Sequence, residues 1–144
     1  MTDTKKDATK LYGDEHVRTY RETGGELGHI WKEGSTVLLL TTKGRKTGKE
    51  TTTPLIYARD GDNYVIVASK GGAPKNPAWY ENLRKDPEVE VQVEGDVFFA
   101  RARTAEGEER ERAWAKANEV WPHYAEYQQK TDRTIPVVVL ERAT

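Results

Sequence analysis

The first strong β signal is the stretch Val37-Leu38-Leu39-Leu40-Thr41-Thr42, followed by Lys43-Gly44-Arg45-Lys46-Thr47-Gly48-Lys49. The first six residues are apolar or β-branched, which favours a strand, and the glycines and polar residues after them are typical of a turn. Residues 51–58 are expected to form the returning strand. After a turn at 60–63, a third strand is expected over 64–69, which completes a three-stranded meander.

Three more strands are expected further along the chain. Valines alternate with Glu and Gln over 88–94, which predicts a strand with one buried face and one solvent-exposed face. After Gly95-Asp96, the stretch 97–104 alternates in the same way and predicts a hairpin. A last buried strand is expected over 135–140.

Helices are expected between these strands. A short helix precedes Gly24-Gly25, because paired glycines favour a left-handed helix end. Asn76 is expected to be the N-cap of a second helix, with Pro77 at its first position. Residues 106–120 have apolar groups at helical spacing, and Pro122 separates them from a shorter helix that carries Tyr124.

Together these elements predict a mainly β protein with inserted helices, of the α+β class. Six strands in two hairpin-joined groups fit a small antiparallel barrel. The chain of 144 residues is long enough for one domain. We expect a polar segment over 1–33, partly disordered or forming a short helix, and the barrel domain over 34–144.

Composition excludes several classes of protein. The chain has no Cys, so a disulfide framework, a thiolate zinc site and a cysteine nucleophile are excluded. With 23 Lys+Arg and 24 Asp+Glu, the net charge of −1 does not favour binding to nucleic acid. No apolar run is longer than five residues, against the roughly 20 that a membrane span needs. No secretory signal or metal site is expected, and the location is expected to be cytoplasmic.

Positive charge is concentrated between residues 43 and 75. This stretch holds seven basic residues, Lys43, Arg45, Lys46, Lys49, Arg59, Lys70 and Lys75, and three acidic ones, Glu50, Asp60 and Asp62. Glycines let backbone N–H groups approach a phosphate, and basic side chains on the same turn can bind its oxygens. The turn at 43–49 is nevertheless not a P-loop, and lysines that merely protect a strand edge are an equally good interpretation.

Two further clusters could contribute to a site. Ser69-Lys70-Gly71-Gly72, followed by a helix start at Asn76-Pro77, forms a second turn suited to an anion, so an extended acidic ligand is indicated. Trp121, His123, Tyr124 and Tyr127 form an aromatic strip. From spacing alone, core packing is the favoured role of this strip, and a tyrosine that donates a proton is the alternative.

The order of motifs resembles the deazaflavin (coenzyme F420)-dependent nitroreductase and quinone reductase family. The resemblance covers roughly residues 20–140. It rests on the stretches Leu38–Gly48, Thr53-Pro54-Leu55, Val67–Gly72, Lys75–Leu83, Trp121–Gln128 and Thr131–Val138.

The resemblance implies a split β-barrel, similar to the FMN-binding split barrel, that binds coenzyme F420, a deazaflavin with a phosphate and an acidic tail. It implies that Arg45, Lys46, Thr47 and Lys70 hold the phosphate and tail. Ala68, Ser69, Trp79 and Asn82 would lie along the deazaflavin, and Gly44, Pro54, Gly71 and Asn76 complete the expected cofactor set. Tyr124 and Tyr127 would face the substrate, with Tyr124, Ser69 or water as the proton source.

The implied function is hydride transfer from the reduced deazaflavin to a quinone, enone or nitro-aromatic acceptor. The alternatives are a non-catalytic F420 carrier and an FMN-dependent oxidoreductase on the same barrel. The expected partner is this small-molecule acceptor rather than a nucleic acid. We expect a monomer or weak dimer, with peripheral contact with a membrane left open.

Overall fold

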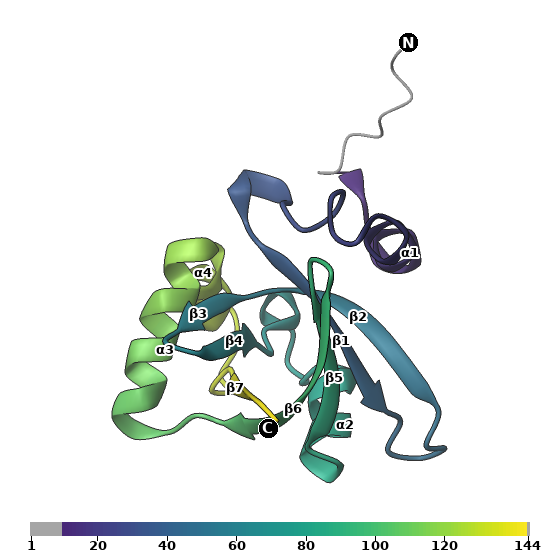
Figure 1. The fold of residues 1–144 in the computed structure, drawn as a ribbon. Coiled ribbons are helices and arrows are strands. Elements are labelled where there is room, and N and C mark those ends of the chain that lie inside the picture. The colour runs from purple at the N-terminus through teal and green to yellow at the C-terminus, as the bar shows by residue number, and fades with distance from the viewer. Residues whose placement is uncertain (1–9, 144) are drawn as a thin grey trace.

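A computed structural model describes residues 10–143, which form one seven-stranded antiparallel sheet with four α-helices (Figure 1). The sheet curves into a half-barrel, and its strand order is β2-β1-β5-β6-β7-β4-β3. The strands are β1 Val37–Lys43, β2 Glu50–Ile56, β3 Ala58–Asp60, β4 Asn63–Val67, β5 Glu88–Val93, β6 Asp96–Thr104 and β7 Val137–Arg142. The helices are α1 Gly13–Thr23, α2 Ala78–Lys85, α3 Gly107–Val120 and α4 His123–Gln129, with short 3-10 turns η2 Lys32–Gly34 and η3 Lys70–Gly72.

The prediction of six strands was wrong, because the stretch expected as one strand over 51–58 is two. β2 pairs with β1 as far as Ile56, whereas β3 pairs with β4 from Ala58 onward. Between them, Tyr57 is buried and its N–H donates to the carbonyl of Thr36. The chain therefore passes at Tyr57 from one edge of the sheet to the other.

The predicted meander was also wrong, because β4 pairs with β7 and not with β2. Residues 64–67 of β4 and 137–140 of β7 are all buried. A continuous apolar run of this kind is typical of a strand covered on both faces. The two strands therefore lie side by side within the sheet, although Val67 and Val137 are 70 positions apart in the sequence.

The hairpin predicted over 88–104 is confirmed as β5 and β6, which pair in register from Glu88–Arg101 to Val93–Asp96. Its alternation is confirmed as well. Phe98, Ala100 and Ala102 are buried, while Phe99 and Arg101 are exposed on the other face.

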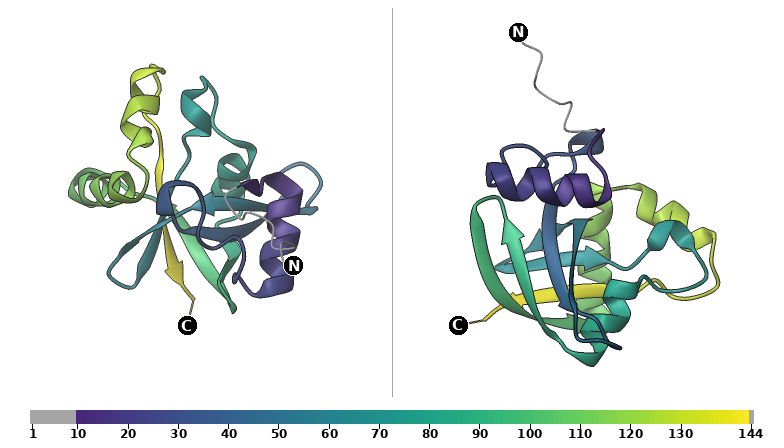
Figure 2. Two further views of the ribbon diagram at one scale, coloured as in Figure 1. Left: turned by 90° about the horizontal axis from the view of Figure 1, so that it is seen from above. Right: turned by 90° about the vertical axis from the view of Figure 1, so that its right-hand side faces the viewer.

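Each face of the curved sheet carries part of the core. Leu38, Ile66 and Val138 lie on the inner face, where α2 covers them with Trp79, Tyr80 and Leu83. Val65, Val67 and Val139 point to the opposite face and pack under α3 and α4. Figure 2 shows these two helices on one side of the sheet and α1 lying across the other end.

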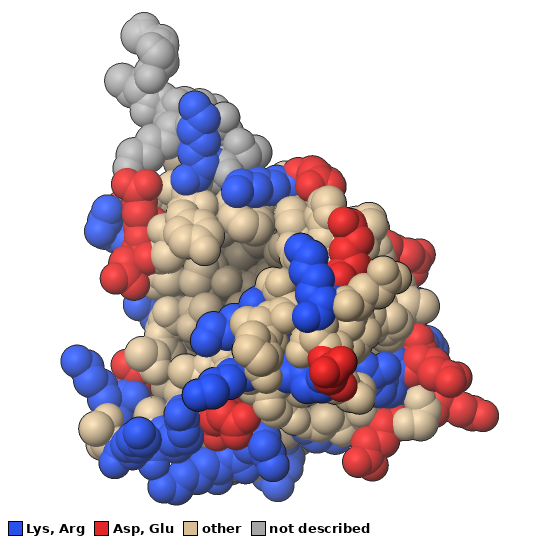
Figure 3. Space-filling model, turned by 180° about the vertical axis from the view of Figure 1, so that it is seen from behind, with Lys and Arg blue, Asp and Glu red and all other residues tan. Residues whose placement is uncertain are grey.

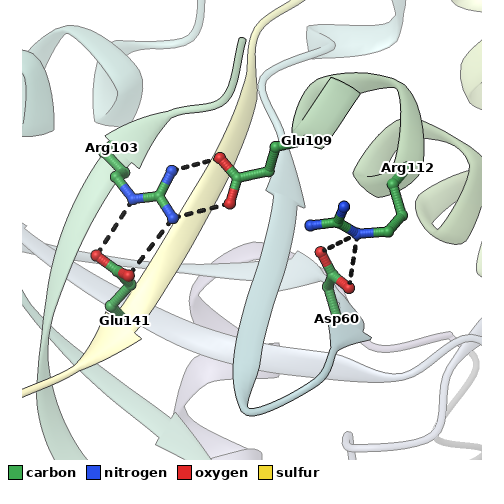
Figure 4. A network of polar contacts seen from close by, with 5 residues as sticks. All are labelled: Asp60, Arg103, Glu109, Arg112 and Glu141. Carbon is green, nitrogen blue, oxygen red and sulfur yellow. Dashed lines mark hydrogen bonds and ion pairs between the residues drawn. The ribbon is translucent and has the colours of Figure 1, made fainter. Parts of the chain in front are cut away.

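Ion pairs fix α3 to the sheet (Figure 4). Arg103 on β6 lies between Glu109 on α3 and Glu141 on β7, and Arg112 on α3 binds Asp60 on β3 with both carboxylate oxygens within 3.2 Å. The hydrogen bonds from Arg103 hold the pKa of Glu109 below its usual value. Because α4 follows α3 closely in the sequence, this network also helps to position α4.

The start of α2 differs from the prediction. Pro77 is the N-cap and the helix begins at Ala78, with no side-chain capping bond. Asn76, the predicted N-cap, instead donates from its amide to Glu81 and accepts a bond from Arg133.

No helix within residues 10–143 is both long enough and apolar enough to span a bilayer.

Tyr20 joins α1 to the sheet, and we predict that its hydroxyl is important for stability. The side chain is fully buried; its hydroxyl donates to Val37 O at 2.9 Å and accepts from Glu94 N at 2.7 Å. Burial raises its pKa to about 12, so the hydroxyl stays protonated at neutral pH. Tyr20→Phe leaves the Glu94 N–H without this acceptor and should lower the free energy of unfolding by about 1–3 kcal/mol, measured by urea denaturation.

Tyr12→Phe is the matched control, because the Tyr12 side chain is 76% exposed. It should unfold at the same urea concentration as the wild type. Equal stability of Tyr20→Phe and Tyr12→Phe would contradict the assigned role of the Tyr20 hydroxyl.

Candidate active site

A cavity of about 390 Å³ opens between β2, the turn after β4, the start of α2, and α4; we call it the main cavity. Its lining is largely aromatic and aliphatic, with a few hydroxyl groups and one lysine. The lining residues are Trp31, Thr53, Pro54, Leu55, Ile56, Val67, Ser69, Lys70, Gly71, Pro77, Trp79, Trp121, Tyr124 and Tyr127. A mostly apolar pocket with few polar groups is typical of a site for a small organic ligand.

The turn over residues 69–72, which we call the glycine turn, forms one wall of this cavity. Lys70, Gly71 and Gly72 all have positive φ values, of 46°, 63° and 85°. A Cβ atom on Gly72 would lie 2.7 Å from the carbonyl oxygen of Tyr127. Glycine is therefore required where this turn meets α4, both by its φ angle and by the close approach of the two backbones.

Arg133 supports the glycine turn from behind. Its guanidinium donates to Ala68 O at 3.2 Å, Ser69 O at 2.7 Å, Ala73 O at 2.9 Å and Asn76 Oδ1 at 2.8 Å. All four acceptors are neutral, and Arg133 has no ion pair with a carboxylate among the described residues. A guanidinium remains charged in proteins, so a positive charge is kept behind the cavity wall.

Two buried hydroxyl groups in the main cavity are available to a ligand, besides that of the half-buried Thr53. Ser69 and Tyr124 are 8% and 6% exposed, and neither hydroxyl has a hydrogen-bond partner among the described residues. Burial raises the pKa of Tyr124, so this hydroxyl is protonated at neutral pH and can donate. The Tyr127 hydroxyl, in contrast, accepts a bond from Trp121 Nε1 at 3.3 Å.

The basic turn, residues 43–49, lies against the C-terminal half of α2. Asn82 Oδ1 accepts from the backbone N–H and the guanidinium of Arg45, at 3.2 and 3.1 Å, and Lys85 Nζ donates to Arg45 O at 2.7 Å. Trp79, one helical turn before Asn82, lines the main cavity. One short helix therefore contacts both the cavity and the basic turn. Figure 3 shows Lys and Arg side chains gathered below the hollow on this face.

Half of the predicted site residues line the main cavity. They are Pro54, Ser69, Lys70, Gly71, Trp79, Tyr124 and Tyr127. The others, Gly44, Arg45, Lys46, Thr47, Ala68, Asn76 and Asn82, do not line it. Ala68 is fully buried in the core, and Asn82 and Asn76 are bonded to Arg45 and Arg133. The roles of all these residues toward a ligand remain predictions.

The sequence prediction missed Trp31, which lines the main cavity from the segment before β1. Its ring stacks on that of Trp121, with centroids 6.1 Å apart, and its Nε1 donates to Leu11 O at 3.0 Å. A tryptophan in an otherwise polar segment was the available signal. Thr53 and Ile56 were missed because nothing in β2 distinguishes them from other strand residues.

His123 ties the segment that carries Trp31 to α4. Its Nε2 lies 2.8 Å from Glu33 Oε2 and its Nδ1 lies 2.9 Å from Glu126 Oε2. Both ring nitrogens face carboxylate oxygens, so both must carry protons for both bonds to form. The hydrogen bonds to Glu33, and then to Glu126, raise the pKa of His123.

Within residues 10–143, no three His, Cys, Asp or Glu side chains are placed to share a metal ion.

The family model and the curated relative that match the chain carry the same description. The family model described as F420H(2)-dependent quinone reductase matches residues 12–142. An F420H(2)-dependent quinone reductase of Mycobacterium tuberculosis (strain H37Rv) is 45% identical over 130 residues, which are 88% of this chain and 87% of the relative.

Two solved structures are similar to the chain. One, described as an F420-H2 dependent reductase, is 49% identical with a TM-score of 0.69, and the match covers 73% of this chain and 93% of that one. The other, described as a domain-swapped dimer, is 44% identical with a TM-score of 0.71, covering 87% and 92%.

We predict that His123 titrates above its ordinary pKa of about 6.5 and that Glu33→Gln moves the midpoint down, as measured by NMR of the imidazole signals. Since the folded-state pKa is raised, the bridge stabilises the fold fully below about pH 6.5 and loses this effect as the pH rises through the raised value. Glu119→Gln, a change on α3, is the control and should leave the midpoint in place. A midpoint at or below 6.5 in the wild type would contradict the bridge.

Proposed function

Because this chain belongs to the F420H(2)-dependent quinone reductase family, we propose that it reduces a quinone with the reduced deazaflavin coenzyme F420. One observation supports this most directly. An apolar cavity with two buried hydroxyl groups that lack a partner within residues 10–143 shares a helix, α2, with a cationic turn. This combination suits a flat redox ring joined to an acidic tail.

The residues present fit such a coenzyme. Its phosphate and acidic tail need cations, which Arg45, Lys46 and Lys70 supply at exposed positions on the two turns. Its ring needs a flat apolar surface beside a few polar groups, which Trp79 and Pro54 supply in the main cavity. The charge of Arg133 behind the glycine turn adds to the attraction for an anion.

The remaining cavity residues suit the acceptor. When bound, the reduced deazaflavin supplies a hydride. Reduction of a quinone to a quinol takes up this hydride and one proton, and negative charge develops on the quinone oxygen. The hydroxyls of Tyr124 and Ser69 can donate hydrogen bonds to that oxygen, which stabilises the charge. Trp31, Trp121 and Tyr127 supply aromatic surface in the same cavity.

Three finer expectations belong to the same proposal. The half-barrel corresponds to one part of a split β-barrel of the FMN-binding type. The chain is a monomer or a weak dimer, and dimerisation is supported by the similar structure described as a domain-swapped dimer. The protein is cytoplasmic and makes peripheral contact with the inner face of the cell membrane. Sedimentation and vesicle flotation test the last two.

We expect the wild type to bind coenzyme F420 at low ionic strength, measured through the change in cofactor fluorescence. Lys46→Ala and Lys70→Ala should each weaken binding by about 3- to 10-fold, and high salt should reduce the difference because exposed charges are screened. Lys116→Ala on α3 is the control and should bind like the wild type. Absence of binding at low salt, or displacement by equimolar FMN, would disprove the assigned coenzyme.

Tyr124→Phe should lower kcat for oxidation of the reduced cofactor by menadione on the order of 10²-fold, with cofactor affinity unchanged, because one donor to the developing charge is lost. Cofactor absorbance gives the rate. Tyr127→Phe is the matched comparison and should have a smaller effect, because the Tyr127 hydroxyl already accepts from Trp121. Unchanged turnover in Tyr124→Phe would remove this hydroxyl from the mechanism. Tight cofactor binding without oxidation by any quinone would favour a carrier.

A further inference from the structure

A second cavity, of about 230 Å³, lies next to the main cavity beneath the start of α1; we call it the side cavity. Its walls come from α1, the segment before β1, β1 itself and the edge strand β2. The lining residues are Tyr12, Gly13, His16, Trp31, Val37, Thr53, Pro54 and Ile56.

The two cavities are neighbours along β2. Trp31, Thr53, Pro54 and Ile56 line both of them. Trp31 is only partly buried and stands at the junction, held by its bond to Leu11 O and by its stacking on Trp121. A molecule that occupied both cavities would therefore pass Trp31 and the edge strand β2.

The chemistry of the side cavity is apolar. None of its eight described lining residues is Lys, Arg, Asp or Glu. His16 is 2% exposed and its Nε2 already bonds to Gly28 O at 2.9 Å, while Trp31 Nε1 is bonded to Leu11 O. Apart from the uncharged hydroxyls of Tyr12 and Thr53, little hydrogen-bonding capacity is left for a guest, and a charged guest would lose its hydration without compensation.

The size is sufficient for a hydrocarbon group. An apolar protein cavity of about 150 Å³ can bind benzene, so about 230 Å³ has room for a short branched alkyl chain. Each methylene group that is fully buried tightens binding by about fourfold. The cavity can therefore discriminate strongly between acceptors with and without such a chain.

We propose that the side cavity binds the aliphatic side chain of a lipid-type quinone whose ring lies in the main cavity. This inference rests on the proposed function and adds a specificity site to it. Val37 and Ile56 form the apolar floor, and Tyr12 forms the outer rim, where the chain of the quinone leaves the protein.

The test compares two acceptors that share one ring: menadione, which has no side chain, and its 3-prenyl derivative, which has one five-carbon unit. With reduced F420 and wild-type protein, the KM for the prenyl derivative should be at least about 10-fold lower than that for menadione. Tyr12→Asp places a carboxylate on the apolar rim, and it should raise the KM for the prenyl derivative by about 5- to 10-fold, so that most of the preference is lost.

Two further variants make the test specific. Tyr12→Leu keeps an apolar rim and should retain the preference of the wild type. Phe99→Ala, which removes an exposed aromatic side chain on β6 away from both cavities, should retain it too. Equal KM values for the two acceptors in the wild type, or equal KM changes for both in Tyr12→Asp, would overturn the proposal.

A binding measurement separates failure of this inference from failure of the proposed function. Both quinones can quench tryptophan fluorescence on binding beside Trp31, and this titration needs no cofactor. If neither quinone oxidises reduced F420, the proposed function fails, and the quenching constants decide the side cavity alone. Tighter binding of the prenyl derivative that is lost in Tyr12→Asp would support it, and equal binding of both quinones would overturn it.

Discussion

The guanidinium of Arg133 donates hydrogen bonds to three backbone carbonyls and to Asn76, and the shape of the main cavity depends on these bonds. They connect the segment before β7 to the end of β4, to the glycine turn and to the approach to α2. They add to the backbone hydrogen bonds within the turn, from Gly72 N to Ser69 O and from Ala73 N to Lys70 O, in holding three consecutive residues with positive φ. Since every acceptor is neutral, the same group that shapes the wall also leaves a positive charge behind it.

The local structure was largely readable from the sequence, and the long-range pairing was not. Alternation over 88–104 predicted the β5–β6 hairpin, and Gly24 ends α1 with φ of 60°, as paired glycines indicated. The break at Tyr57 has no local signal, because 51–58 is uniformly suited to a strand. The break depends on the pairing of Ala58 with β4 and on the pairing of β4 with β7. The β4–β7 pairing joins segments so far apart in the sequence that no short window contains both.

The candidate site shows the same division. Residues of the glycine turn and of α4, which the sequence singled out, line the main cavity, because each motif is short and keeps its own shape. The basic turn does not line the cavity and is instead bonded to α2 through Asn82. Asn82 is 6% exposed; its side-chain amide accepts from Arg45 and donates to the hydroxyl of Thr42, so it links the basic turn to β1. Trp31 could not be placed beforehand, since its position depends on the loop before β1 folding back over β2.

The position of β7 has a consequence for how the protein is made. β7 is the last described strand along the chain, yet it lies between β6 and β4 in the middle of the sheet. During synthesis, one edge of β4 and one edge of β6 stay unpaired until β7 has been made. Pairings between segments so distant in the sequence form slowly. Until Val137–Leu140 is inserted, the unpaired edges of β4 and β6 are exposed, and exposed strand edges make a nascent chain prone to aggregate.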